Sequence, residues 1–282
     1  MINFASRNLK LYFRQKSAVF ASLLGIFIIV VLYALFLGDM VAMDGVNNAK
    51  ELVDTWMIAG LVAITPFTTA FGALGAMVND KAGGQLRDFY ASPVSRVRIV
   101  GGYVISGLAV GLLLSLVALA LGEIYIVLRG GSLLGWEDML CLLGAILLSV
   151  TLSGTFGFLI VCFISTTNTY MVVSIIIGSM TGFLTGMYVP VGSLGGGVQW
   201  LVKLFPITHT SAIIRQIMCH RVIEDSFAGA ELYAAEYREA MGITLTFGDY
   251  VMPLWLHCVI AAVLSVIFFA LASLKVSREK RR

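Results

Sequence analysis

Long apolar runs separated by short polar segments dominate the chain. Six of these runs are long enough to cross the roughly 30 Å hydrocarbon core of a bilayer as helices, which takes about 20 residues. They lie near residues 18–37, 56–78, 99–126, 139–164, 169–189 and 251–274. This pattern predicts an all-α integral membrane protein with six transmembrane helices in a single domain, 1–282.

The composition supports a membrane protein over a soluble one. Apolar residues make up 59% of the 282 residues and charged residues only 12%, against roughly 45–50% and about 25% in soluble domains. A soluble core of this size would leave too much apolar surface in water. The first apolar run has no small-residue cleavage site, so we expect it to stay in the membrane and not to be removed as a signal peptide.

Residues 1–17 carry four basic residues and no acidic one. Apolar and basic side chains recur on opposite sides at helical spacing, which is typical of a helix in the headgroup layer. The apolar side is Ile2, Ala5, Leu9 and Tyr12, and the basic side is Arg7, Lys10 and Arg14. The pattern predicts an interfacial helix; a solvated basic tail is the alternative.

The segment before the last predicted span is less regular. Pro190 and Pro206 bracket a stretch that contains three consecutive glycines and is too short to cross the membrane. We expect residues 190–250 to form a re-entrant or outer helical piece followed by a polar, acidic extracytoplasmic loop over 207–250.

Lysine and arginine are distributed unequally between the two sides of the predicted spans. Thirteen lie on the side of the N-terminus, the loop 79–98 and the basic tail 275–282, against six on the other side. Because cytoplasmic loops carry an excess of these residues, both termini are predicted to be cytoplasmic. The localisation expected is the cell (inner or plasma) membrane, with multiple passes.

The cytoplasmic loop 79–98 contains a short helical pattern. Leu86, Phe89 and Tyr90 fall at i, i+3 and i+4, which gives one apolar side. Glycines at 83 and 84 precede the pattern, and Ser92-Pro93 ends it. An exposed aromatic side suits docking of another protein, and a helix resting on the lipid surface fits the pattern equally well.

Small and hydroxyl residues mark two of the predicted spans. Gly178, Gly182 and Gly186 recur every four residues, a spacing that lets helices approach closely in lipid. They indicate packing within the subunit, an interface with a second copy, or a wall of a translocation path. Pro66 interrupts the backbone hydrogen bonds of the second span beside Thr68 and Thr69, which predicts a kink with either a static or a gating role.

Candidate chemistry is sparse. His209, His220 and Glu224 lie close together in the sequence, but no HExxH pattern accompanies them, and a membrane zinc hydrolase is not supported. Glu123 and His257 do not make a proton relay, and no GxxxxGK[ST] phosphate loop occurs. We therefore expect no catalytic residue, metal or cofactor in this chain.

Two groups of residues resemble the permease subunit of ABC-2 type ATP-driven exporters. Asp80, the triplet Gly84-Gln85-Leu86 and Ser92-Pro93 resemble that family's acid, Gly-Thr-Leu-like triplet and Ser-Pro stop. Gly186 to Pro190, followed by Pro206-Ile207-Thr208 and Arg215, resembles a second family pattern, with His209 where an aromatic residue is usual. The resemblance also covers the length, the number of spans and the basic amphipathic start.

The resemblance implies an all-α permease that exports a substrate by alternating access. Coupling to the ATPase is implied for Asp80, Gly84, Leu86, Arg87, Phe89 and Tyr90. The expected partners are two copies of a separate ABC ATPase subunit that carries ATP and Mg, a second permease copy or a paralogue, and membrane lipid, with no nucleic acid. The apolar, hydroxyl-dotted spans favour a hydrophobic or amphiphilic substrate such as a drug, antibiotic, peptide or lipid. The alternatives are an ATP-independent channel or secondary transporter, and a membrane scaffold.

Overall fold

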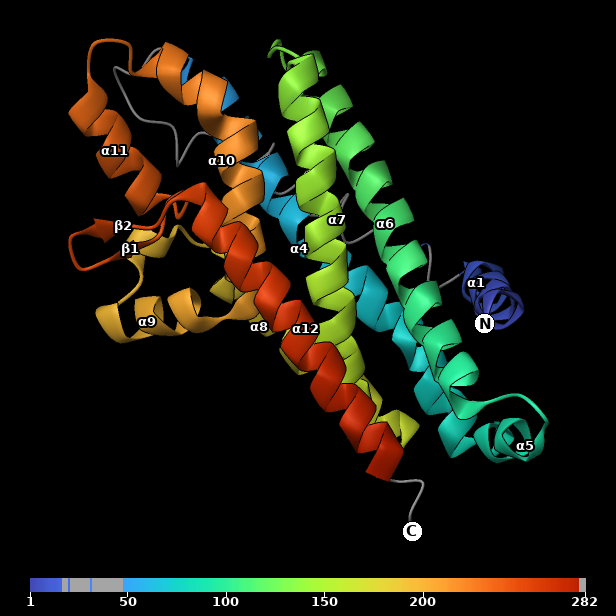
Figure 1. The fold of residues 1–282 in the computed structure, drawn as a ribbon. Helices are drawn as coiled ribbons and strands as arrows, with labels where there is room; N and C mark the ends of the chain where they lie inside the picture. Colours follow the sequence, from blue (N-terminus) through green and yellow to red (C-terminus); the bar gives the residue numbers. More distant parts are fainter. Residues whose placement is uncertain (17–19, 21–30, 32–47, 279–282) are drawn as a thin grey trace.

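The computed structural model describes residues 1–16, 20, 31 and 48–278 and is almost entirely helical (Figure 1). Five described helices are long and apolar enough to cross a membrane. They are α4 (Ala49–Ala82), α6 (Arg96–Leu128), α7 (Trp136–Val161), α8 (Thr167–Leu184) and α12 (Leu254–Arg278). The all-α membrane fold is thus confirmed. The first predicted span, 18–37, lies outside the described residues, so the count of six stays a prediction.

Helix α4 is the centre of the bundle. Its most apolar stretch is 89% buried, and it packs against α6, α7, α8 and α10 (Pro206–Ser226). Trp56, Phe67 and Leu74 are among its fully buried side chains. At about 1.5 Å per residue, 34 residues span about 51 Å. One continuous helix therefore links the two ends of the bundle.

Helices α8 and α12 lie at the outside of the bundle. Only 11% of the most apolar stretch of α8 and 17% of that of α12 is buried. Thr166 is the N-cap of α8, and its hydroxyl accepts a hydrogen bond from the Thr169 amide at 3.2 Å. It ends at Leu184, five residues before the predicted end at 189.

The segment after α8 is folded and not a loop. A 3-10 turn (Val191–Ser193) and the short helix α9 (Gly196–Leu204) lie where the sequence predicts a short re-entrant or outer piece. Helix α10, helix α11 (Glu231–Ala240) and a hairpin of β1 (Thr246–Phe247) and β2 (Tyr250–Val251) follow. The prediction of a solvated loop over 207–250 is therefore wrong for its first half, because α10 packs between α4, α7 and α12.

The polar sequence of α10 explains that error. Its buried positions include serine, threonine, histidine and arginine, and several of these side chains bond other helices or the turn after α8. Thr210 bonds Ser149 of α7 at 3.2 Å, and His209 Nδ1 lies 3.0 Å from His257 Nδ1 of α12. A helix surrounded by protein does not need the continuous apolar surface that lipid demands.

The N-terminal helix α1 (Ile2–Arg14) lies across α6, near the end of the bundle that carries α5 (Gln85–Ala91) (Figure 1). Of the predicted apolar side, Ala5 and Tyr12 are buried in the protein, whereas Ile2 is 79% exposed and the polar Asn8 is buried. Gly102 allows this contact: a Cβ there would lie 2.7 Å from the Phe4 ring and 3.3 Å from the Ala5 backbone nitrogen. The two backbones thus approach more closely than a side chain would permit.

We predict that Gly102→Ala lowers the melting temperature of the purified protein and loosens α1. The added methyl meets α1, and overpacking of this kind costs about 1–3 kcal/mol. Gly144→Ala in α7 is the matched control, since a Cβ there meets nothing within 4 Å and alanine improves helix propensity. Thermal unfolding in detergent and limited proteolysis of α1 measure the effect. Equal behaviour of the two variants would contradict it.

Candidate functional site

The predicted coupling segment forms a separate short helix at one end of the bundle. Helix α4 closes at Gly83, and Gly84 takes a left-handed conformation with φ 84° before α5 begins. Only glycine adopts that conformation without strain. At the other end of α5 the Ser92 hydroxyl donates to the Phe89 carbonyl at 2.6 Å. The turn and the stop that the sequence predicts are both present.

The side of α5 that carries Leu86, Phe89 and Tyr90 faces the protein's own core. Leu86 is only 6% exposed, and Phe89 and Tyr90 are half-buried against the same cluster. Arg87 and Asp88 are the charged residues on the exposed side. The expectation of an exposed aromatic surface is therefore corrected: the apolar residues seat α5 on the bundle, and charged residues point outward.

Asp80, at the end of α4, joins three helices. Its carboxylate accepts hydrogen bonds from Arg7 of α1 at 2.8 and 3.3 Å and from the Tyr103 hydroxyl of α6 at 2.5 Å. The hydrogen bond to Asp80 raises the pKa of Arg7 above its ordinary value. The side chain of Asp80 is only 12% exposed and that of Arg7 34%, so solvent screens the pair only partly.

An aromatic cluster connects this ion pair to α5. Phe4 of α1 meets Phe89 of α5 and Tyr103 of α6 edge to face, with centroid distances of 5.2 and 5.1 Å. The Arg7 guanidinium lies 4.9 Å from the Phe89 ring centre, within the range of a cation–π interaction. Helices α1, α4, α5 and α6 are thereby held at one junction, which we call the α5 junction: Phe4, Arg7, Asp80, Leu86, Phe89 and Tyr103.

A second polar centre lies where α8 ends. Arg215 of α10 is 1% exposed and donates to the carbonyls of Thr185 and Gly186, each at 2.8 Å. Thr208 of α10 donates to the Leu184 carbonyl at 2.9 Å. A helix terminus leaves carbonyls without intrahelical partners and carries partial negative charge. Helix α10 thus caps the end of α8 with a cation and a hydroxyl.

Trp56 of α4 completes this centre. Its ring lies 5.0 Å from the Arg215 guanidinium, and its indole N–H donates to the Met241 carbonyl at 2.9 Å. Gly60, one turn further along α4, leaves the space: a Cβ there would lie 2.9 Å from Arg215 Nη2. We call Trp56, Thr208, Arg215 and the carbonyls of residues 184–186 the arginine cap.

The three glycines predicted on one side of α8 have three different environments. Nothing lies within 4 Å of a Cβ at Gly178, whereas one at Gly182 would strike the Tyr188 ring of the same chain. Gly186 lies beyond the helix, at φ 68° in the turn that Arg215 caps. The prediction of one helix side formed by all three is therefore wrong, because α8 ends at Leu184.

Helix α4 continues through Pro66, and threonine hydroxyls bond the carbonyls beside it. Thr65 donates to Leu61 at 2.7 Å and Thr69 to Thr65 at 2.6 Å. Thr68 is the exposed member of the group, with longer bonds to Ile64 and Thr65. The proline region is thus a hydrogen-bonded part of one continuous helix.

The histidines do not form a metal site with the residues near them in sequence. His209 and His257 are buried and bond each other through Nδ1, so one ring donates and the other accepts. His220 forms an exposed pair with Glu224 at 3.4 Å. In the described part of the chain, no group of three or more His, Cys, Asp or Glu side chains could hold a metal ion.

A family model described as ABC-2 type transporter matches residues 3–219. The match covers well over half of the chain, from α1 into α10, and includes both the α5 junction and the arginine cap. This chain therefore belongs to the ABC-2 type transporter family and is the membrane permease component of such a transporter. A search of curated proteins found no matching sequence.

Sequence reasoning named Asp80, Leu86 and Phe89, and the structure brings these three into one junction. It missed Arg7 and Tyr103. Arg7 lies on the basic side of the N-terminal helix, a pattern that predicted contact with lipid headgroups and not with the Asp80 carboxylate. Nothing in the sequence pattern pointed from Tyr103 to Asp80, since the contact depends on how α6 crosses α4.

We predict that Arg7→Gln and Asp80→Asn each lower the free energy of unfolding by about 1.5–3 kcal/mol, the range for a hydrogen bond to a charged group. The double variant should lose less than the sum, because both changes remove the same interaction. Chemical unfolding of all four forms in detergent measures the coupling. Additive losses would show that the two side chains act independently.

We also predict that Arg215→Lys destabilises the protein by more than 1 kcal/mol despite the unchanged charge. An ammonium cannot reproduce the planar fork that bonds two carbonyls and stacks on Trp56. Arg221→Lys, at an exposed position of the same helix, is the control and should be neutral within about 0.5 kcal/mol. Indole fluorescence during unfolding measures both. An unchanged free energy of unfolding in Arg215→Lys would contradict the role given to the guanidinium in the arginine cap.

Proposed function

We propose that this chain is the permease subunit of an ATP-driven exporter that moves an amphiphilic substrate by alternating access. The observation that carries the proposal is α5, a short helix that is seated through its apolar side and presents Arg87 and Asp88 outward. A helix seated in this way can receive force from a partner without unfolding. The family match, which includes α5, supports the same assignment.

The partner proposed for α5 is a separate ATPase subunit, in two copies per transporter, which would carry ATP and Mg. Arg87 and Asp88 would contact it, and Leu86, Phe89 and Tyr90 would pass its motion to the bundle. Because the α5 junction binds α1, α4 and α6 together, a displacement of α5 moves all three. Catalysis of ATP hydrolysis would belong to the partner, and this chain would supply the substrate path.

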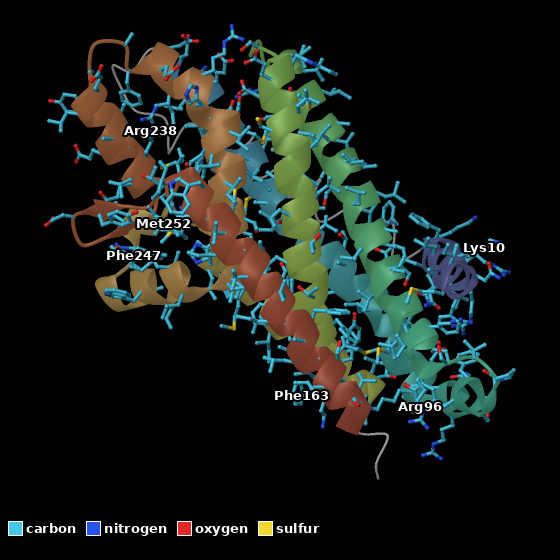
Figure 2. The ribbon with its side chains drawn as sticks, viewed as in Figure 1. Lys10, Arg96, Phe163, Arg238, Phe247 and Met252 are labelled. Atoms are coloured by element: carbon cyan, nitrogen blue, oxygen red, sulfur yellow. The ribbon has the colours of Figure 1, made fainter. Side chains whose placement is uncertain are left out.

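The charge distribution supports a cytoplasmic position for the α5 end of the bundle. Helix α1, α5, the start of α6 and the end of α12 all carry basic residues, and Lys10 of α1 and Arg96 of α6 are labelled in Figure 2. Most acidic residues of the described part lie at the other end, including Glu51 and Asp54 of α4. By the positive-inside rule the α5 end would face the cytoplasm of the cell.

A second permease copy, or a paralogue, would pack on the open sides of α4 and α8. The exposed positions of α4 include Thr68, Gly72 and Asn79, which are small or polar and therefore suit a partner or a substrate path better than lipid. Helix α8 borders them, since the Tyr170 hydroxyl donates to the Phe71 carbonyl at 2.8 Å. The exposed residues of α12, in contrast, are mostly large and apolar, as lipid requires.

We predict that Arg87→Glu combined with Asp88→Lys abolishes co-purification of an ATPase and the transport that depends on it, while the permease still inserts and unfolds at the same temperature. Both side chains are exposed, so their reversal leaves the internal contacts of α5 intact. A pull-down from gently solubilised membranes, followed by an ATPase assay, measures the effect.

Arg14→Glu, at an exposed position on α1, is the control for a charge reversal outside α5 and should leave the complex intact. Leu86→Ala should instead lower both stability and coupling, because it removes the buried contact of α5. If the unaltered protein carries no ATPase under these conditions, the proposal fails and an ATP-independent channel or secondary transporter replaces it.

A further inference from the structure

A cavity of about 450 Å³ opens at the α5 end of the bundle, between the start of α6 and the end of α12. Both helices pack against α7, and the cavity lies where they part. None of its lining residues belongs to α4 or α8, on whose open sides we place a second copy. Neither the coupling role of α5 nor the substrate path accounts for it.

The walls of the cavity are apolar along most of their length. Val100 and Val104 of α6, Phe158 of α7 and Phe269 of α12 line it. From Arg96 to Val104, eight residues at 1.5 Å each extend about 12 Å along α6. The apolar part therefore runs well into the depth of the spanning helices, where the surrounding medium is hydrocarbon.

The mouth of the cavity is polar and basic. Arg96, in the first turn of α6, and Ser273 and Ser277, near the end of α12, line it there. Arg96 is exposed and lies beside α5 (Figure 2). A cation and two hydroxyls at one end of an apolar slot match a molecule with an anionic head and a hydrocarbon tail.

We propose that this cavity binds an anionic phospholipid of the leaflet at the α5 end, with its headgroup at Arg96 and one acyl chain between α6, α7 and α12. The charge of Arg96 selects an anionic headgroup over a zwitterionic one. The valine and phenylalanine walls accept the chain. This assignment needs only that the α5 end lies at a membrane surface, so it does not rest on the direction of transport.

The site also touches the seat of α5. The Arg96 guanidinium lies 4.6 Å from the ring centre of Tyr90, on α5. A headgroup bound at Arg96 therefore shares that side chain with the helix that we propose to couple to the ATPase. Occupancy of the cavity is linked to how firmly Tyr90 is held, and lipid of this class stabilises α5 on the bundle.

The test is lipid binding to the purified full-length protein, measured by native mass spectrometry with phosphatidylglycerol and with phosphatidylcholine of the same chains. We expect Arg96→Gln to weaken phosphatidylglycerol binding about fivefold and to leave phosphatidylcholine unchanged. Arg98→Gln is the matched control, because Arg98 is exposed in the same turn of α6 but does not line the cavity. Ser273→Trp, which fills the mouth from an exposed position, should weaken both lipids.

Three results overturn the proposal: equal affinity of the unaltered protein for the two lipids, unchanged binding by Arg96→Gln, or equal losses in Arg96→Gln and Arg98→Gln. The last result would mean that a diffuse basic surface attracts lipid without a site. Lipid binding and the ATPase pull-down are separate measurements, so failure here and failure of the transporter proposal give separate results.

Discussion

The end of α8 sets the strongest constraint on this fold. Its 18 residues extend about 27 Å, and its last carbonyls face protein and not water. A buried carbonyl without a partner costs about 1–3 kcal/mol, and several of them would make the turn unstable. Arg215 and Thr208 satisfy three successive carbonyls from one helix. The position of α10, and with it that of α9 and α11, follows from this requirement.

The arginine cap also explains why the two halves of the second family pattern, Gly186 to Pro190 and Pro206 to Arg215, occur together. Gly186 supplies the turn at positive φ, and Thr208 and Arg215 supply the donors that bond its carbonyls. Neither half is stable by itself in lipid. The turn at Gly186 would leave carbonyls without donors, and Arg215 would be a buried cation without acceptors. Spacing along the chain suggested the pair, and the hydrogen bonds show its physical reason.

Hydropathy predicted the bounds of the spanning helices well for helices at the outside of the bundle. It predicted them poorly for helices that are surrounded by other helices. Helices α6 and α12 agree with the predicted spans within a few residues, because their outer surfaces must be apolar. Helix α4 begins before the predicted start at 56, since Asp54 is paired with Arg129 at 3.1 Å and does not end the helix. Helix α10 escaped prediction for the same reason. Its buried His209 and Arg215 have partners on other helices, and pairing across helices leaves no mark on a hydropathy pattern.

The candidate coupling residues show a similar division. The turn glycine, the stop at Ser92 and the apolar side of α5 could all be predicted, since each is a local property of the chain. The direction of that apolar side could not, because it depends on α1 and α6 arriving from elsewhere to enclose Leu86 and Phe89. A short amphipathic helix has the same pattern whether it buries its apolar side in its own protein, in a partner or in lipid.

Helix α4 connects the two polar centres. Asp80 at one end is fixed to α1 and α6, and Trp56, about 6.7 turns away at 3.6 residues per turn, belongs to the arginine cap. Between them the helix is continuous, and threonine hydroxyls from both sides of Pro66 bond carbonyls that precede it. A packed helix of this kind transmits a shift at one end more readily than it absorbs one. Any tilt of α4 that the α5 junction imposes must therefore either move the arginine cap or bend the helix at the proline, where one backbone hydrogen bond is already missing.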